Sequence, residues 1–321
     1  MGLFRNHMPV EGKTVLITGA SEGMGLSVAI QLAAKGANLI LLSRSESKLQ
    51  VALKSVEAAA LDPSTQRFHY IQADVAVHDY ARGVLADATA WNEGRSPDIV
   101  WCCAGMSAPQ LFLEMDVSSM RRQMDINFFG TVEMTQAILR EWCANDTPVE
   151  KEAKHIIMTG SVATMVVIPG YIPYVPSKAA MRGVAEGLHM ELMMYPQNVE
   201  VHLVTPGTIL SPGFEQEQLI KPEISKSLEK SDPKLTPDEA ARAAIRGLER
   251  GEFIITLTWQ NWLMKCGTYG IAWKNNWFID VLMAAIMSLI IWPIVDLDLR
   301  GQVKKHVKKF GSPKVQRKPL E

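Results

Sequence analysis

Tyr174 and Lys178 place a phenol and an ammonium group four residues apart in the sequence. In a helix this spacing is about one turn, so both side chains project from the same face. A tyrosine near its usual pKa of about 10 is a slow acid at neutral pH, and a neighbouring cation lowers that pKa. Ser161 lies 13 residues upstream, just past an apolar run, where its hydroxyl can reach the same reacting oxygen. The three residues together indicate acid–base chemistry at one oxygen atom.

A glycine-rich stretch follows the first apolar run of the chain and precedes a helical pattern. It reads Thr18-Gly19-Ala20-Ser21-Glu22-Gly23-Met24-Gly25. Glycines here permit a tight turn, close approach of the backbone to a pyrophosphate and close packing of helix on strand, and the helix N-terminus supplies N–H donors. We therefore predict a dinucleotide-binding turn, with cofactor contacts from Gly19, Ser21, Glu22, Gly23 and Gly25.

The same letters also spell Gly-x-Ser-x-Gly, from Gly19 to Gly23, which is the nucleophile elbow of α/β-hydrolases. In a hydrolase this elbow normally lies deeper in the sheet and is followed by an acid and then a histidine. Its place in the first strand-to-helix turn makes hydrolysis the weaker interpretation.

Arg44 and Lys48 occupy the end of the second predicted strand, where an NAD-binding chain carries an acid for the ribose hydroxyls. A carboxylate would repel a 2′-phosphate, whereas the planar guanidinium of Arg44 can bind one through two hydrogen bonds. NADPH is the predicted cofactor, and the alternative is that Arg44 is an ordinary solvated residue at a helix start.

Alternation of short apolar runs with longer helical stretches organises the first 258 residues. This pattern predicts an α/β, Rossmann-type, doubly wound fold with a seven-stranded parallel sheet. Residues 236–251 carry the start and stop signals of a helix, and residues 207–235 are expected to be a loop with a short helix that closes over a substrate. The expected strands are residues 14–18, 38–43, 68–73, 99–103, 155–159, 199–204 and 253–257.

These motifs, with Asp74-Val75 after the third strand and Asn127 in a helix, resemble the short-chain dehydrogenase/reductase family in type and order. The resemblance implies carbonyl reduction, with Tyr174 as proton donor, Lys178 as ribose ligand and modifier of the tyrosine pKa, and Ser161 polarising the carbonyl. It also implies that Asn127 anchors a proton-relay water, that Asp74 holds the adenine ring, and that Val75 and Thr208 contact the cofactor. The family's usual Asn-Asn-Ala-Gly is Cys102-Cys103-Ala104-Gly105 here, which puts the stabilising role of the missing amides in doubt.

The last 63 residues differ in composition from the catalytic part. Five of the eight tryptophans fall between Trp259 and Trp292, and residues 281–295 carry no formal charge. As a helix this stretch reaches roughly 22 Å, short of about 30 Å of hydrocarbon. We predict a membrane-associated helical segment at 259–299, inserted shallowly or as a hairpin, followed by a basic tail at 300–321 on anionic lipid. The alternative is a buried C-terminal helix or an oligomer interface.

Charge and cysteine content exclude several other classes. The tail carries +7 and the rest of the chain −8, so the basic face of a nucleic-acid-binding protein is missing. Four cysteines without a framework pattern indicate a reducing compartment. The seven histidines show no metal-site spacing, so no metal is predicted. The first 12 residues lack a secretory or lipidation signal.

The Cys-Cys-Ala-Gly variant and the apolar, basic C-terminus narrow the resemblance to family members that reduce long-chain sphingoid ketones. It implies an endoplasmic-reticulum membrane protein whose catalytic domain faces the cytosol. Members of the family often pack the helix that carries Tyr174 against a partner subunit, so a homo-oligomer is one expectation. Candidate substrate contacts are Glu215 or Glu217 for an amine, and an alkyl path along Met165, Val166, Val167 and Ile168. A core or interface role is the equal alternative for these four apolar residues. The rival interpretations are a membrane-associated reductase of steroids, retinoids or other lipid carbonyls, and a catalytically silent NADPH-binding module.

Overall fold

The computed structural model describes residues 6–165, 168–230 and 232–266, with short stretches between 281 and 308. The central element is a seven-stranded, all-parallel sheet with the order β3-β2-β1-β4-β5-β6-β9. Its strands are β1 (Thr14–Thr18), β2 (Asn38–Ser43), β3 (Phe68–Gln72), β4 (Ile99–Cys102), β5 (Lys154–Thr159), β6 (Val199–Thr205) and β9 (Ile254–Thr256). All seven predicted strands are confirmed, and no end differs by more than one residue from its prediction.

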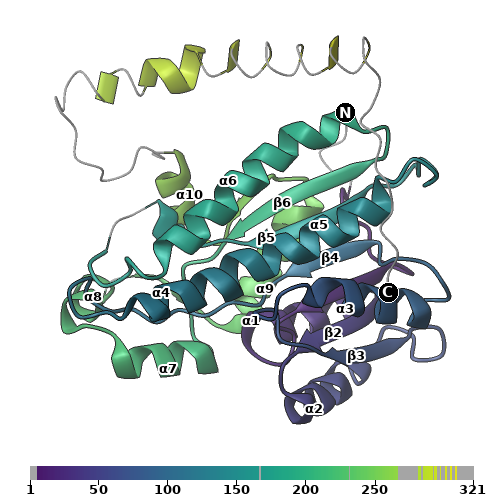
Figure 1. The fold of residues 1–321 in the computed structure, drawn as a ribbon, viewed down its shortest axis with the longest axis horizontal. Coiled ribbons are helices and arrows are strands. Elements are labelled where there is room, and N and C mark those ends of the chain that lie inside the picture. Colours follow the sequence, from purple (N-terminus) through teal and green to yellow (C-terminus); the bar gives the residue numbers. More distant parts are fainter. Residues whose placement is uncertain are drawn as a thin grey trace.

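Helices cover both faces of the sheet, which explains why the strands are apolar along their whole length. One core cluster joins the sheet to α1 (Gly23–Ala33), α2 (Glu46–Glu57) and α9 (Pro237–Glu249). The other joins it to α3 (Tyr80–Trp91), α5 (Gly130–Trp142) and α6 (Val175–Glu191), which cross the front of the sheet in Figure 1. The doubly wound fold is therefore confirmed.

Two helices illustrate how local sequence sets these boundaries. Helix α9 begins with a capping box, in which the Thr236 hydroxyl accepts from the Glu239 N–H and the Glu239 carboxylate accepts from the Thr236 N–H. Helix α4 (Val117–Met124) runs into α5 through a π-helical turn, Asp125–Phe129. The π turn carries Asn127, and such turns often occur at functional sites.

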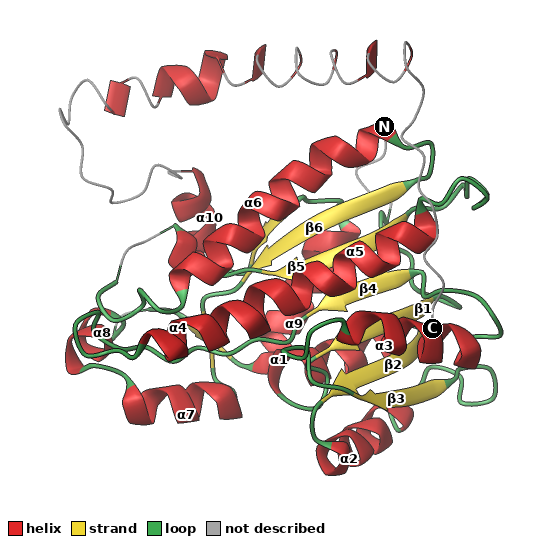
Figure 2. Ribbon diagram, viewed as in Figure 1, coloured by secondary structure: helices red, strands yellow, loops and turns green. Residues whose placement is uncertain are grey.

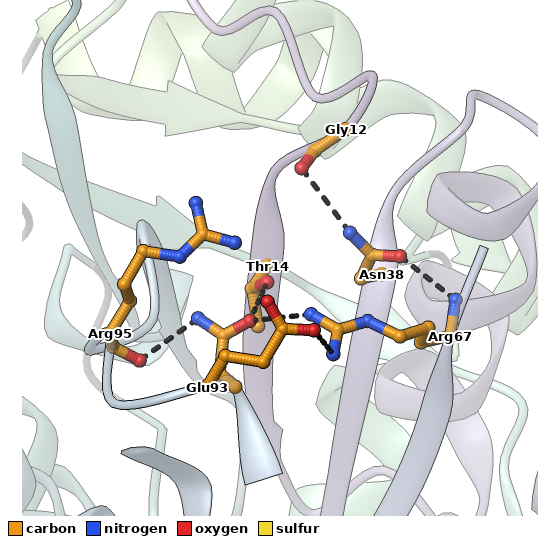
Figure 3. Close-up of polar contacts among 7 residues, drawn as sticks. Gly12, Thr14, Asn38, Arg67, Glu93 and Arg95 are labelled. Carbon is orange, nitrogen blue, oxygen red and sulfur yellow. Dashed lines mark hydrogen bonds and ion pairs between the residues drawn. The ribbon is translucent and has the colours of Figure 1, made fainter. Parts of the chain in front are cut away.

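A polar network closes the amino ends of the first strands, at the edge opposite the glycine-rich turn (Figure 3). The Asn38 side chain donates to the Gly12 carbonyl at 3.2 Å and accepts from the Arg67 N–H at 2.8 Å. Buried Asn92 accepts from the Thr14 hydroxyl at 3.0 Å and from the Arg67 guanidinium at 3.1 Å. These bonds satisfy backbone and side-chain groups that burial would otherwise leave unpaired.

Residues 207–235 contain more regular structure than the sequence predicted. They form α7 (Pro212–Ile220), α8 (Glu223–Leu228) and a two-stranded parallel pair, β7 (Thr208–Ile209) with β8 (Lys234–Leu235). The prediction of a loop with a short helix missed one of the two helices and the strand pair, since strands of two residues are too short to show alternation. Figure 2 shows this segment, here called the lid, beside the tips of the strand arrows.

The C-terminal prediction falls mostly outside the described residues. Helix α10 (Trp259–Cys266) follows β9, and its Lys265 ammonium donates to the Ile254 carbonyl at 3.2 Å. Among the residues that the structure describes, no helix has the length and hydrophobicity needed to cross a bilayer.

Candidate active site

The glycine-rich turn between β1 and α1 has the close backbone approaches that the sequence predicted. Gly19 has φ +70°, and a Cβ there would lie 2.7 Å from the Ala104 Cα. Gly23 has φ +58°, and a Cβ on Gly25 would lie 2.3 Å from the Gly19 carbonyl oxygen. The conflicts at Gly19 and Gly25 are with backbone atoms, which cannot rotate away. The turn is therefore a cradle that a side chain would fill, as a pyrophosphate site requires.

Substituting Gly25→Ala tests this cradle. We expect it to lower the free energy of unfolding by about 1–3 kcal/mol, because the added methyl meets the Gly19 backbone, and to weaken NADPH binding. Urea unfolding and a fluorescence titration with NADPH measure the two effects. Gly83→Ala is the matched control, since nothing lies within 4 Å of a Cβ at that position in α3. Equal stability and NADPH affinity in the two variants would contradict the cradle.

The predicted cofactor residues around the turn are brought together at the carboxyl edge of β1 and β2. The Ser21 and Ser43 hydroxyls lie 2.8 Å apart. Glu22 and Lys48 form an exposed ion pair at 2.6 Å, so each of these two predicted cofactor contacts has a protein partner. Arg44 follows β2 with an exposed side chain.

The next loops along the same edge hold the remaining predicted contacts. The Asp74 carboxylate accepts from the Ala76 N–H at 3.0 Å, which fixes the turn after β3. Val75 is buried, and its carbonyl oxygen lies 2.8 Å from the place where a Cβ of Gly130 would be. Thr208 is half-buried in β7, at the start of the lid.

Asn127 is fully buried, and its amide makes three hydrogen bonds. Its Oδ1 accepts from the Met106 N–H at 2.8 Å, and its Nδ2 donates to the Met106 carbonyl at 2.9 Å and to the Ser177 hydroxyl at 3.0 Å. A Cβ on Gly105 would lie 3.1 Å from Asn127 Oδ1 and 3.4 Å from Lys178 Nζ. Asn127 therefore ties the loop after β4 to the helix that carries Lys178.

Cys102 and Cys103 replace the two asparagines that the family usually has after β4, and here Thr18 holds the loop. The Thr18 hydroxyl accepts from the Cys103 and Ala104 N–H groups, both at 3.1 Å. Burial raises the pKa of the Cys102 thiol to about 12, so it stays protonated at neutral pH. Thr18 thus supplies the support for the loop backbone that the sequence analysis placed in doubt.

Ser161, Tyr174 and Lys178 meet at the carboxyl end of β5. Ser161 follows that strand, and its hydroxyl accepts from the Ala163 N–H at 3.1 Å. Tyr174 precedes α6, and Lys178 lies in the first turn of that helix with its ammonium 5.9 Å from the centroid of the tyrosine ring. The Lys178 ammonium donates to the Thr159 carbonyl at 2.8 Å. The constellation predicted from spacing is therefore assembled in the fold.

The electrostatics of this trio differ from the expectation that Lys178 lowers the tyrosine pKa. Burial raises the pKa of Tyr174, the Ser161 hydroxyl opposes that rise by hydrogen bonding, and the Glu217 carboxylate adds to it. Burial also lowers the pKa of Lys178 to about 8. The reason is that both groups leave water together, and the lysine is turned toward Thr159. The raised pKa keeps Tyr174 protonated at neutral pH and also makes it a weaker acid than a free tyrosine.

A buried ion cluster beside the tyrosine was missed by sequence reasoning. The Lys221 ammonium contacts the Glu217 carboxylate at 2.7 Å and the Glu229 carboxylate at 2.5 Å, and all three side chains are at least 87% buried. The Tyr171 hydroxyl donates to Glu217 at 2.7 Å, and the Tyr171 and Tyr174 rings are 6.0 Å apart. Only the Glu-x-x-x-Lys spacing of Glu217 and Lys221, at the end of α7, hinted at part of this cluster.

The predicted substrate contacts have mixed outcomes. Glu217 points into the ion cluster, whereas Glu215 is exposed. In the predicted alkyl path, Met165 is buried and Ile168 is half-buried, and Val166 and Val167 lie outside the described residues.

Comparisons with known proteins agree with the fold and with the family resemblance. The short chain dehydrogenase family model matches residues 13–219. The chain is 51% identical to 3-ketodihydrosphingosine reductase gsl-3 of Neurospora crassa, over 98% of this chain and 88% of that protein. It is 39% identical to 3-ketodihydrosphingosine reductase ksrA of Aspergillus fumigatus, over 99% and 90%. A short-chain dehydrogenase from Sphingobium yanoikuyae in complex with NADPH has a similar fold, with TM-score 0.65 and 22% identity over 80% of this chain and 93% of that one.

Proposed function

Because the chain belongs to the short-chain dehydrogenase/reductase family, we propose that it reduces 3-ketodihydrosphingosine to dihydrosphingosine with NADPH, in sphingolipid synthesis. The observation that carries the proposal is that Ser161, Tyr174 and Lys178 lie beside the glycine cradle. The chain that holds them is 51% identical, over almost its full length, to a reductase named for that substrate.

The residues divide the chemistry of this reduction between them. A bound reduced nicotinamide supplies the hydride that the carbonyl carbon receives. The Tyr174 hydroxyl delivers the proton to the carbonyl oxygen, while the Ser161 hydroxyl polarises that oxygen. Asn127 and Lys178 hold the surrounding loops, and Lys178 would also contact the ribose of the bound cofactor. One ketone, one NADPH and one proton thus give the alcohol and NADP⁺.

The direct test is NADPH oxidation by the detergent-solubilised protein with 3-ketodihydrosphingosine, beside NADH and a steroid ketone. We expect turnover with the sphingoid ketone and NADPH. Bound NADPH without turnover of this ketone, but with turnover of a steroid or retinoid carbonyl, would leave the family assignment in place and overturn the substrate. NADPH binding without turnover of any ketone would indicate the silent cofactor-binding module.

Arg44 is the proposed reader of the 2′-phosphate. Substituting Arg44→Asp should raise the KM for NADPH about 10- to 100-fold, since it removes a charge-assisted hydrogen bond and adds a repelling carboxylate. The KM for NADH should change much less, which makes NADH the internal control. An equal change for both cofactors would show that Arg44 does not distinguish them.

We also propose that the enzyme works at the endoplasmic-reticulum membrane with its catalytic domain in the cytosol. A long-chain ketone is poorly soluble, so an enzyme seated on the bilayer can take it directly from lipid. Exposed apolar side chains in the lid and in α10 support a lipid contact. They are Leu219, Ile220, Ile224 and Leu228 of α7 and α8, and Trp259 and Trp262 of α10. The basic tail adds attraction to anionic lipid. The proposal includes a homo-oligomer in which two copies of the chain pack together through α6.

Protease treatment of sealed microsomes tests the orientation. We expect the catalytic domain and the tail to be cleaved from outside without detergent. Protection of the tail alone would show that residues 259–299 cross the bilayer once, contrary to a shallow or hairpin insertion.

A further inference from the structure

Two buried histidines and a glutamate converge on the β5–β6 strand pair, away from the catalytic trio. His155 lies near the start of β5 and pairs in register with Glu200 of β6, and His202 follows Glu200 by two residues. In adjacent parallel strands this register puts the three side chains on one face of the sheet. Ser161 and Lys178 lie beyond the opposite, carboxyl end of β5.

A hydrogen bond to the backbone fixes which nitrogen atom of His202 carries the proton. The Nδ1 of His202 lies 2.9 Å from the Glu252 carbonyl, which can only accept, so this nitrogen carries the proton and Nε2 presents a lone pair. The His202 Nε2 is therefore an acceptor.

Three heavy atoms that accept or bind cations meet at this point. His155 Nδ1 lies 3.1 Å from His202 Nε2, and the Glu200 carboxylate oxygen lies 3.8 Å and 3.6 Å from these two nitrogens. At most one proton, on His155 Nδ1, lies between the two nitrogens, and the carboxylate faces the lone pair of His202. Two imidazole nitrogens and a carboxylate oxygen this close together are a ligand set that a divalent cation can bind.

The spacing matches one face of a tetrahedral metal site. Ligands at about 2.0–2.1 Å from a tetrahedral zinc ion are about 3.3–3.4 Å from one another, close to the separations in this triangle. Nitrogen from imidazole with one carboxylate oxygen is a common zinc ligand set. The bond from His202 Nδ1 to a backbone carbonyl is the support that metal-binding histidines usually have.

We propose that His155, Glu200 and His202 form a binding site for a divalent transition-metal ion, best fitted by zinc, with water as the remaining ligand. Access is available because Glu200 and His202 line a surface hollow together with His7, His189 and Tyr195. The nearby Lys13 ammonium is occupied by Glu152 at 2.6 Å. The ion would join β5, β6 and the loop that carries Glu252, far from the hydride-transfer site.

The sequence prediction of no metal rested on spacing along the chain. His155 is 45 residues before Glu200, and only the pairing of β5 with β6 brings them together. A pattern such as Glu-x-His at 200–202 carries no metal signal without the third ligand.

Zinc alone is the probe for a direct test on the full chain without a histidine tag. After chelator treatment and dialysis, the protein competes for Zn²⁺ with a chromogenic chelator, and Co²⁺ uptake is followed by its d–d absorption. We expect one ion per chain in the wild type and in the matched control His78→Gln, whose histidine is exposed and distant. Glu200→Gln should weaken zinc binding about tenfold or more, and His202→Gln should remove the site.

Glu200→Gln keeps the test decisive if His202→Gln folds poorly, because Glu200 is half-exposed. Circular dichroism and NADPH oxidation check folding, and turnover should be unchanged in Glu200→Gln since the site is remote from Tyr174. Zinc stoichiometry or affinity equal in Glu200→Gln and wild type would overturn the proposal and leave a neutral hydrogen-bonded histidine pair. A cobalt–thiolate charge-transfer band would also overturn it, because it would place the ion on cysteine.

Discussion

Replacing Tyr174 with phenylalanine is expected to lower kcat about 10²- to 10⁴-fold, the usual contribution of a positioned proton donor. The substitution removes the only atom of the side chain that can deliver a proton, and the ring can keep its place against Tyr171, whose centroid is 6.0 Å away. NADPH affinity should be nearly unchanged, because Gly19, Gly25 and Arg44 are untouched.

Stopped-flow oxidation of NADPH and a fluorescence titration separate these two effects. Tyr195→Phe is the matched control, since Tyr195 lines the hollow at the far end of β6, and it should retain wild-type turnover. Retained turnover in Tyr174→Phe would assign the proton to another group. A parallel loss of NADPH affinity would instead mean that the phenol holds the cofactor.

The local parts of the fold and site could be predicted from the sequence because each depends on a short segment. β1 and the turn at Gly19–Gly25 are adjacent in the chain, so apolar periodicity and glycine spacing identify both. Tyr174 and Lys178 are one helical turn apart, which fixes their shared face. Helix α9 carries its own capping box and was expected for that reason.

The parts that sequence reasoning missed depend on contacts between distant segments. The ion cluster meets the active site through the bond from Tyr171 to Glu217, which lies 46 residues further along the chain, and His155 meets His202 only across β5 and β6. The pKa of Tyr174 is another case: its spacing from Lys178 predicts a lower value, but burial, a property of the whole fold, raises it. Strand pairs as short as β7 and β8 leave no periodic pattern at all.

The two carboxylates that share Lys221 make the lid sensitive to loss of that single cation. Glu217 and Glu229 are 13% and 12% exposed, and the Lys221 side chain is 1% exposed. Removing one partner of a buried ion pair leaves uncompensated charge and costs on the order of 3 kcal/mol or more. Lys221→Met should therefore open the lid locally, with backbone amides of α7 and α8 exchanging with deuterium about 100-fold faster.

Hydrogen exchange measured peptide by peptide tests this expectation, and Lys226→Met is the matched control in the same helix pair. Lys226 pairs with Glu223 at the surface, where the glutamate side chain is 87% exposed, and such a pair contributes about 0–1 kcal/mol. Adding Glu217→Gln and Glu229→Gln to Lys221→Met should restore much of the protection, because the stranded charges are gone. Equal exchange in Lys221→Met and Lys226→Met would show that the cluster does not hold the lid. Glu217 raises the pKa of Tyr174, so a lid that opens in Lys221→Met should lower that pKa, and it should also raise the KM for the ketone.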